Sequence, residues 1–142
     1  MRLSKITEDD LEFARRLRNQ FRQWFFMSEG LTRDQQLLWY QGLITSPEVD
    51  FRIIVVGAER VGTISLTNRS DGRIEIGNVI IAYQHQGKGY AKQAVKMQLA
   101  PTRTYFSRVK PENVASKGLF QGLGFIARTD VEWELFPLAQ EC

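Results

Sequence analysis

Several residue types that build reactive or metal-binding sites are almost missing from this chain. Its 142 residues include one cysteine, Cys142, and one histidine, His85. A single cysteine forms neither an intrachain disulfide nor a cluster of thiolate ligands. A single histidine excludes multi-histidine zinc or iron sites and argues against a catalytic triad built on histidine. The sequence therefore predicts no metal site, and Cys142 is expected to have no functional role.

Long apolar runs are also absent. No run approaches the roughly 20 residues that a membrane-spanning helix needs, and no apolar signal region follows the N-terminal residues 1–5. The composition, 43% hydrophobic and 25% charged, is ordinary for a globular protein. We expect a single domain over residues 1–142, in the cytoplasm and without membrane contact.

Positive charge is concentrated in the middle of the chain. Residues 51–100 contain seven Lys and Arg against three Asp and Glu, whereas the segments on either side are close to balance. There is no Lys/Arg cluster and no basic stripe with interleaved aromatic residues, so nucleic acid is not the expected partner. The pattern favours a small polyanionic ligand near the middle of the chain.

A glycine loop lies within this basic segment. Gln86-Gly87-Lys88-Gly89-Tyr90-Ala91 follows the apolar run 79–82 and precedes an apolar-periodic segment that reaches about Leu99. This strand, loop and helix pattern leaves backbone N–H groups uncovered at a helix start, which suits a pyrophosphate. Its glycine spacing matches neither the dinucleotide fingerprint nor the P-loop. Short glycine loops are common, so on these residues alone the motif is weak and a plain strand-to-helix turn is the favoured interpretation.

The periodicity of the chain changes from helical to extended at Phe51. Helices are predicted at 7–20 and 32–44, where Thr7 and Thr32 give capping signals. The β-rich runs 51–56, 61–66 and 73–81 are joined by turns short enough to require antiparallel pairing. Further strands are predicted at 102–109, 125–127 and 131–136, and a further helix at 113–121. The order predicts a mixed α/β (α+β) fold, with a largely antiparallel sheet of about six to seven strands flanked by about four helices.

Two motifs in this order resemble the GNAT superfamily of N-acetyltransferases. The first is Gln-x-x-Gly-x-Ala at Gln86, Gly89 and Ala91. The second begins at an asparagine and ends in Gly-Phe, and is present as Asn113, Ser116, Phe120, Gly124 and Phe125. The N-terminal half, with Leu-Arg-Asn at residues 17–19 and aromatic residues after it, looks like the branch of sugar-nucleotide amine and ribosomal-protein N-terminal acetyltransferases.

The resemblance implies that acetyl-CoA is the cofactor and lies in a V-shaped split between the fourth and fifth strands. It places the backbone of Ile80, Ile81 and Ala82 along the pantetheine arm. It assigns the pyrophosphate to Gln86, Gly87, Lys88, Gly89, Tyr90 and Ala91, and cofactor contacts to Asn113, Ser116 and Phe120.

Candidate catalytic residues are few. Glu75 is the only carboxylate on the strand that leads to the glycine loop, so it is either the general base or a cross-strand partner of a basic residue. Many family members have tyrosine, the acid that protonates the thiolate, at the position of Phe120. Ser116 and Tyr83 are the expected substitutes, and Glu132 and Glu134 are reserve candidates for the base.

The acceptor amine is left open by the sequence. Aromatic residues at 21–26 indicate either core packing or a pocket wall. Three functions are considered, namely acetylation of a small-molecule amine such as an amino-sugar nucleotide, acetylation of a protein N-terminus, and acyl-CoA binding without catalysis. We expect a monomer or a homodimer, and the residues expected near the acceptor are Asn19, Trp24, Phe25, Trp39 and Glu75.

Overall fold

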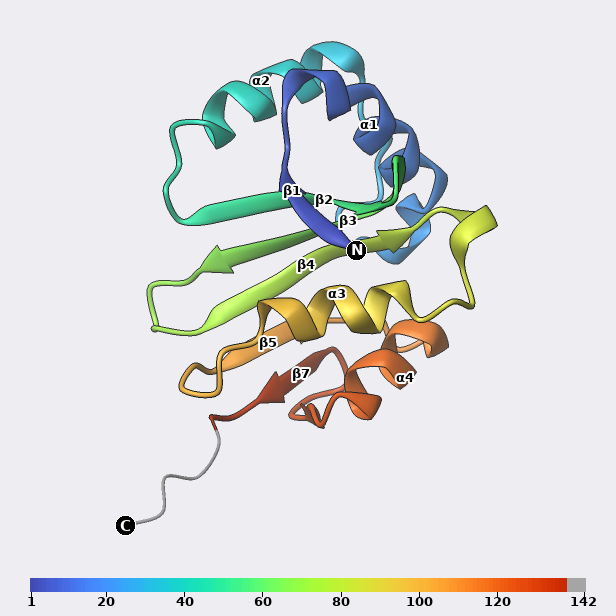
Figure 1. Ribbon diagram of the computed structural model, residues 1–142. Helices are drawn as coiled ribbons and strands as arrows, with labels where there is room; N and C mark the ends of the chain where they lie inside the picture. Colours follow the sequence, from blue (N-terminus) through green and yellow to red (C-terminus); the bar gives the residue numbers. More distant parts are fainter. Residues whose placement is uncertain (138–142) are drawn as a thin grey trace.

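Seven strands form one sheet in the order β1-β2-β3-β4-β5-β7-β6 (Figure 1). The computed structural model describes residues 1–137, so Cys142 lies outside the described part. All neighbouring strands pair antiparallel except β4 and β5, which confirms the predicted fold class. In chain order the elements are β1 Arg2–Lys5, η1 Glu8–Asp10, α1 Leu11–Gln20, η2 Arg22–Trp24, α2 Arg33–Leu43, β2 Val49–Val56, β3 Glu59–Asn68, β4 Ile74–Ile81, η3 Tyr83–His85, α3 Tyr90–Gln98, β5 Tyr105–Arg108, α4 Val114–Gly122, β6 Ile126–Ala127 and β7 Glu132–Leu135.

The capping signal at Thr32 sets the start of α2. Thr32 Oγ1 accepts a hydrogen bond from the Gln35 N–H at 3.1 Å, and Gln35 Oε1 accepts one from the Thr32 N–H at 2.9 Å. This reciprocal pair satisfies two backbone donors that a helix start leaves without partners. Among residues 1–137, no helix is both long enough and apolar enough to cross a membrane.

Helices cover the two faces of the sheet separately (Figure 1). On one face, α3 and α4 contribute Ala94, Val95 and Phe120 to a core that includes Ile54, Ile64 and Trp133. On the other, α1 packs Leu11 and Ala14 against β2, and Leu17 and Phe21 against the end of β4. The apolar stripe of α1 therefore reaches from one side of the sheet to its centre.

The C-terminal strands differ from the prediction. β5 covers only Tyr105–Arg108, because the residues before it form a turn in which the Arg103 N–H donates to Ala100 O at 3.2 Å. The side chain of Tyr105 fixes this turn by accepting from the Ala100 N–H at 2.8 Å. β7 lies between β5 and β6, an order that local periodicity does not encode.

A β-bulge interrupts β4 at Asn78, whose φ of 53° is the one positive value at a non-glycine residue within the described chain. The pairing of β3 with β4 shifts between Thr63 and Ser65 at this point. Thr63 Oγ1 donates to Asn78 O at 2.6 Å, and Asn78 Nδ2 donates to Ser65 Oγ at 2.9 Å. These bonds hold the left-handed residue in place.

The bulge changes the face of the sheet to which the side chains at the end of β4 point. Ile74 and Ile76 belong to the core under α3 and α4, but Ile80 and Ala82 pack against α1. In an uninterrupted strand all four side chains would share one face. One inserted residue therefore decides which groups of the strand end are turned towards β5.

The close approach of β3 to the end of β4 predicts a large effect at Gly62. A Cβ there would lie 2.2 Å from Ile80 O and 2.9 Å from Ile81 Cδ1. We expect Gly62→Ala to lower the free energy of unfolding by about 1–3 kcal/mol, the usual cost of overpacking a core. Urea denaturation measures this change.

Gly42→Ala on α2 is the matched control, because a Cβ at Gly42 meets nothing within 4 Å. It should stabilise the protein by roughly 0.5–1 kcal/mol, since glycine is a poor residue in a helix interior. Equal stabilities of the two variants would show that β3 and β4 are not this close.

Candidate active site

β4 and β5 separate after two paired positions. Ile74 pairs with Tyr105 and Glu75 with Phe106, and no further pair joins the two strands, both of which lie wholly within the described residues. Just beyond, Ser107 Oγ donates to Ile76 O at 2.8 Å, so a side chain takes the place of the next backbone bond. From there to Ile81 the edge of β4 faces an opening between the strands.

The backbone groups of β4 that face this opening belong to Val79 and Ile81. The Ala82 N–H donates to Val61 O at 2.9 Å, so Ala82 is directed to β3, and Ile80 pairs with Thr63 of the same strand. Ile81 O is turned the other way and accepts from Gln86 Nε2 at 2.9 Å. The sequence places the backbone of Ile80, Ile81 and Ala82 along the pantetheine arm. Because of the bulge, the backbone groups of Ile80 and Ala82 are directed to β3, and Val79 joins Ile81 on the side of the opening.

The glycine loop follows at the open end of the split. Gly87 and Gly89 have φ values of 78° and 79°, a conformation that side chains disfavour, and a Cβ at either would meet nothing within 4 Å. The first hydrogen bond of α3 runs from Gln93 N–H to Gly89 O at 3.1 Å. The N–H groups of Tyr90, Ala91 and Lys92 therefore precede the helix ladder.

The loop fits the pyrophosphate of a coenzyme A thioester. Its glycines leave the path to the helix start open, and Lys88 is exposed beside it. The unpaired donors and the positive end of the helix favour an anionic group there. The opening along Val79 and Ile81 continues from this point, as an extended arm with amide groups requires.

The second motif covers α4 and the residues that flank it. Asn113 caps this helix, since its Oδ1 accepts from the Ser116 N–H at 3.2 Å, and Ser116 is half-buried. Phe120 is 2% exposed and packs against Phe125 with ring centroids 5.0 Å apart. The burial of Phe120 gives it a core role and leaves it almost no surface for a cofactor.

The residues expected near the acceptor are spread over two regions. Both ends of the Asn19 amide are used by Leu31, whose O and N–H lie 2.9 and 2.7 Å away, so Asn19 holds the loop before α2. Trp39 packs on Phe51 of β2, two strands from β4 and away from the split. Trp24 and Phe25 lie in the loop that follows α1.

This loop, residues 22–27, spans the split. On the α1 side, Arg18 Nη2 donates to Met27 O at 3.0 Å. On the β5 side, Lys110 Nζ donates to Gln23 O at 2.7 Å, and Arg108 lies 5.3 Å from the ring of Phe26. The loop therefore forms a wall across the face of the split opposite α3 and α4.

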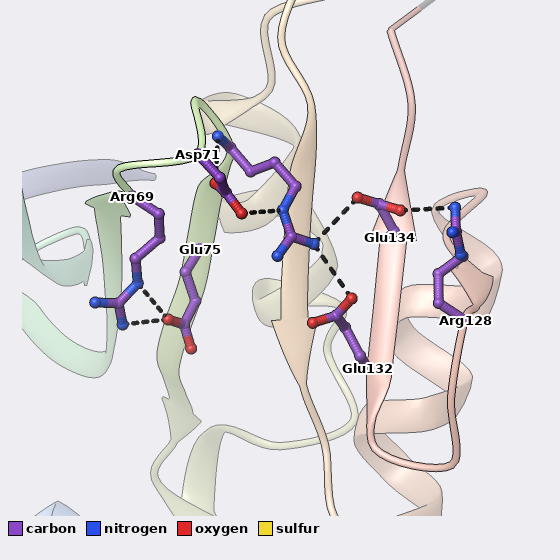
Figure 2. A network of polar contacts seen from close by, with 7 residues as sticks. Arg69, Asp71, Glu75, Arg128, Glu132 and Glu134 are labelled. Atoms are coloured by element: carbon purple, nitrogen blue, oxygen red, sulfur yellow. Dashed lines mark hydrogen bonds and ion pairs between the residues drawn. The ribbon is translucent and has the colours of Figure 1, made fainter.

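Glu75 lies at the closed end of the split, where a network of ion pairs begins (Figure 2). Its Oε1 accepts from Arg69 Nε at 2.8 Å and from Arg69 Nη2, and its Oε2 is 3.5 Å from Arg108 Nε. The Glu75 side chain is 14% exposed. Both carboxylate oxygens are thus occupied by guanidinium groups, which favours the ion-pair interpretation of Glu75 over the general base.

A second group of ion pairs, which includes Asp71, Glu132 and Glu134, lies beside the first and reaches across β5 to β7 (Figure 2). Arg73 is its centre. It bonds Asp71 at 2.9 Å, Glu134 at 3.1 Å and Glu132 at 3.2 Å. The Asp71 carboxylate, followed by those of Glu134 and Glu132, raises the pKa of Arg73 above its ordinary value. The backbone N–H of Arg73, followed by its side chain, lowers the pKa of Asp71. Glu132 and Glu134 are therefore held as ion-pair partners, Glu134 also by Arg128 at 3.0 Å.

A cavity of about 440 Å³ lies apart from the split, beside β1, η1 and the β2–β3 turn. Several polar side chains that line it contact one another, Asp10 with Arg60 at 2.8 Å and Glu59 with His85 at 3.2 Å. Arg2 bonds the Ser4 hydroxyl and the carbonyl of Gly57. Within residues 1–137, no group of three or more His, Cys, Asp or Glu is placed to hold a metal ion. The split is therefore the candidate site, because it combines unpaired backbone groups on β4 with the glycine loop.

The sequence matches the family of the Acetyltransferase (GNAT) domain over residues 1–126. The chain belongs to this family and is an acetyl-CoA-dependent N-acetyltransferase. No curated protein sequence matches it.

Solved structures agree on the fold. An acetyltransferase from Thermus thermophilus is 21% identical with a TM-score of 0.80, covering 94% of this chain and 95% of that one. The putative acetyltransferase yncA from Salmonella typhimurium, solved with acetyl-CoA, is 16% identical with a TM-score of 0.76 and coverages of 100% and 96%. A spermidine N-acetyltransferase from Vibrio cholerae, in complex with CoA and spermine, is 21% identical with a TM-score of 0.75 and coverages of 90% and 82%.

The loop geometry predicts loss of cofactor binding in Gly89→Glu. The new side chain and its negative charge would stand where the helix start offers donors to a phosphate. We expect the Kd for acetyl-CoA, measured by calorimetry, to rise at least about tenfold.

Gly57→Glu in the β2–β3 turn is the control. Gly57 also has a positive φ, 62°, and open space around its Cβ, so the backbone strain is matched. This variant should lose stability but keep its affinity for acetyl-CoA. Unchanged affinity in Gly89→Glu would remove the loop from the cofactor site.

Proposed function

We propose that the protein transfers the acetyl group by direct attack to the primary amine of a small molecule, and that amino-sugar nucleotides are the first acceptors to test. The observation that carries the proposal is the open edge of β4 at Val79 and Ile81, continuous with the glycine loop. The loop 22–27, bonded to Lys110 across the split, favours a small acceptor over an extended peptide because it closes a long groove at this point.

The proposed chemistry uses few side chains. The acceptor nitrogen, in its neutral form, forms a bond to the thioester carbonyl carbon, and the bond from that carbon to sulfur breaks. The N–H of Ile81 faces the split and is the candidate donor to the oxygen that becomes negative. Water takes the proton that the amine loses, since Glu75 is engaged by Arg69 and Arg108.

Tyr83 is the candidate acid for the leaving thiolate. It follows β4 directly, is 57% exposed, and its ring lies 4.6 Å from that of Phe21 at the end of α1. A phenol in this place substitutes for the hydroxyl that Phe120 lacks. Ser116 is the second candidate, one turn before Phe120 on α4.

Thermal unfolding with acetyl-CoA tests the proposal without knowledge of the acceptor. Ligand at about 100 times Kd should add roughly 2.7 kcal/mol, a rise of several degrees in melting temperature. Thiol release is then measured with amino-sugar nucleotides, free amino sugars, polyamines and a peptide with a free N-terminus. Binding without turnover on any amine would indicate an acyl-CoA-binding module, and no shift at millimolar ligand would contradict the whole proposal.

Two substitutions separate catalysis from structure. Tyr83→Phe should lower kcat by about tenfold with an unchanged KM for acetyl-CoA. This effect is smaller than the usual one for a general acid because a thiolate leaves readily.

Glu75→Gln should keep kcat within about twofold and lower the free energy of unfolding on the order of 1 kcal/mol, since it weakens a partly exposed ion pair. The reverse result, with kcat lost only in Glu75→Gln, would return the general base to Glu75.

A further inference from the structure

Arg18 has no carboxylate partner among residues 1–137. It lies on α1 between Leu17 and Phe21, the two residues that pack against Ile80 and Ala82 at the open end of the split. Its Nη1 is the one buried side-chain nitrogen or oxygen atom without a hydrogen-bond partner among the described residues. Burial lowers the pKa of the Arg18 guanidinium from its ordinary value. Arg18 as a whole is half-buried, so the rest of its guanidinium remains within reach of a ligand. A buried donor atom without a partner is costly to the folded state.

The other arginines of α1 are paired. Arg15 and Arg16 bond Glu12 at 2.8 and 2.9 Å, and these bonds, that of Arg15 first, lower the pKa of Glu12 to about 2. The contacts of Arg18 are instead the carbonyl of Met27 and the ring of Phe25, 4.5 Å from its Cζ. Among the described residues no carboxylate pairs with Arg18, in contrast to Arg15 and Arg16 on the same helix.

Lys110 faces the same loop from the other side of the split. Its Nζ is bonded to the carbonyl of Gln23, and within residues 1–137 no carboxylate lies within 4.0 Å of Lys110 or Arg18. Arg108, next to Phe26, shares Glu75 with Arg69. The wall formed by residues 22–27 thus lies between cations whose polar partners are mostly neutral carbonyls.

We propose that Arg18, with Lys110 opposite, binds an anionic group of the acceptor, so that the substrates are small amines carrying a phosphate or a carboxylate. This inference rests on the proposed function. A polycation such as spermine, bound in one of the similar structures, finds no free carboxylate at the closed end of the split, because Glu75, Glu132 and Glu134 are each paired with arginine. Amino-sugar nucleotides carry the required charge in their diphosphate.

Matched acceptor pairs test the inference. Glucosamine 6-phosphate is compared with glucosamine, and β-alanine with β-alaninamide, so that the two arms distinguish phosphate from carboxylate, while spermidine serves as the polycation. We expect kcat/KM to be at least about tenfold higher for the charged member of one pair, the value of one hydrogen bond to a charged group. Equal or better turnover of the uncharged members or of spermidine would overturn the inference.

Arg18→Met should abolish this preference by raising KM for the charged acceptor, while KM for acetyl-CoA stays unchanged. Arg16→Met is the control, since it removes the same charge from an exposed position of the same helix. Arg18→Lys should keep part of the preference, and Lys110→Met should reduce it, so that the test stands if Arg18→Met folds poorly. Retention of the preference in both Arg18 variants would assign Arg18 to the structure of the loop alone.

A binding measurement separates the two hypotheses. If the protein binds acetyl-CoA but acetylates no member of either pair, calorimetry with the same pairs on CoA-loaded protein decides. Tighter binding of a charged member, lost in Arg18→Met, supports the anion site without turnover, and equal binding overturns it. Absence of acetyl-CoA binding would overturn the proposed function. Arg18 would still be tested directly by titrating the charged and the uncharged member of each pair into the protein without CoA.

Discussion

The incomplete pairing of β4 with β5 is the constraint on which the rest of the site depends. A parallel pair that continued to the end of both strands would use the N–H and C=O groups of Val79 and Ile81 within the sheet. Because the pairing stops after two positions, these groups have no strand partner on the β5 side, and Ile81 O is instead bonded by the Gln86 side chain. An edge without a strand partner suits an extended ligand. The bulge at Asn78 completes the arrangement, since it determines which residues occupy that edge.

Charge is distributed differently at the two ends of the split. At the closed end, two groups of ion pairs lie side by side, one around Glu75 and one around Arg73, and each of their carboxylates has an arginine partner. At the open end, the glycine loop and Lys88 lie on one side, and Arg18 and Lys110 lie on the other. The open end is thus suited to two anionic ligands at once, one reaching it along each face of the sheet.

Much of the fold is predictable from the sequence because its signals are local. Alternation and turn residues indicate the hairpins, and two spaced motifs indicate the family. The threonine signal marks the start of α2 at Thr32, whereas Thr7 caps the short helix η1 and α1 begins only at Leu11. The order β5-β7-β6 and the facing of the end of β4 are not predictable in this way, since both depend on pairing between distant segments. The bulge has no strong sequence signature, since it occurs at an asparagine within an apolar run. It nevertheless decides that the backbone groups of Val79, and not those of Ile80 and Ala82, lie at the unpaired edge of β4.

For the site, residue type alone is a weak guide. Glu75 is the single carboxylate of its strand, but its partners Arg69 and Arg108 come from a turn and from another strand. Trp39 and Trp24 are both aromatic and are therefore both expected near the acceptor. The position of Trp39 on α2 instead directs its ring to Phe51 of β2. Arg18 is absent from the residues predicted for the site, because a helix rich in charged residues is typical of a solvated surface. Its lack of an ionic partner is visible only in three dimensions.

Arg73 connects the turn before β4 to β7 by passing over β5, and it lies on the ring of Phe106 with its Cζ 3.9 Å from the centroid. It therefore links the two parts of the sheet at the place where the backbone pairing between them is shortest. The charged side chains of Arg73, Glu132 and Glu134 are largely buried, so ions in solution screen them only weakly. The two parts of the sheet are therefore joined by side chains at the end of the split opposite the glycine loop.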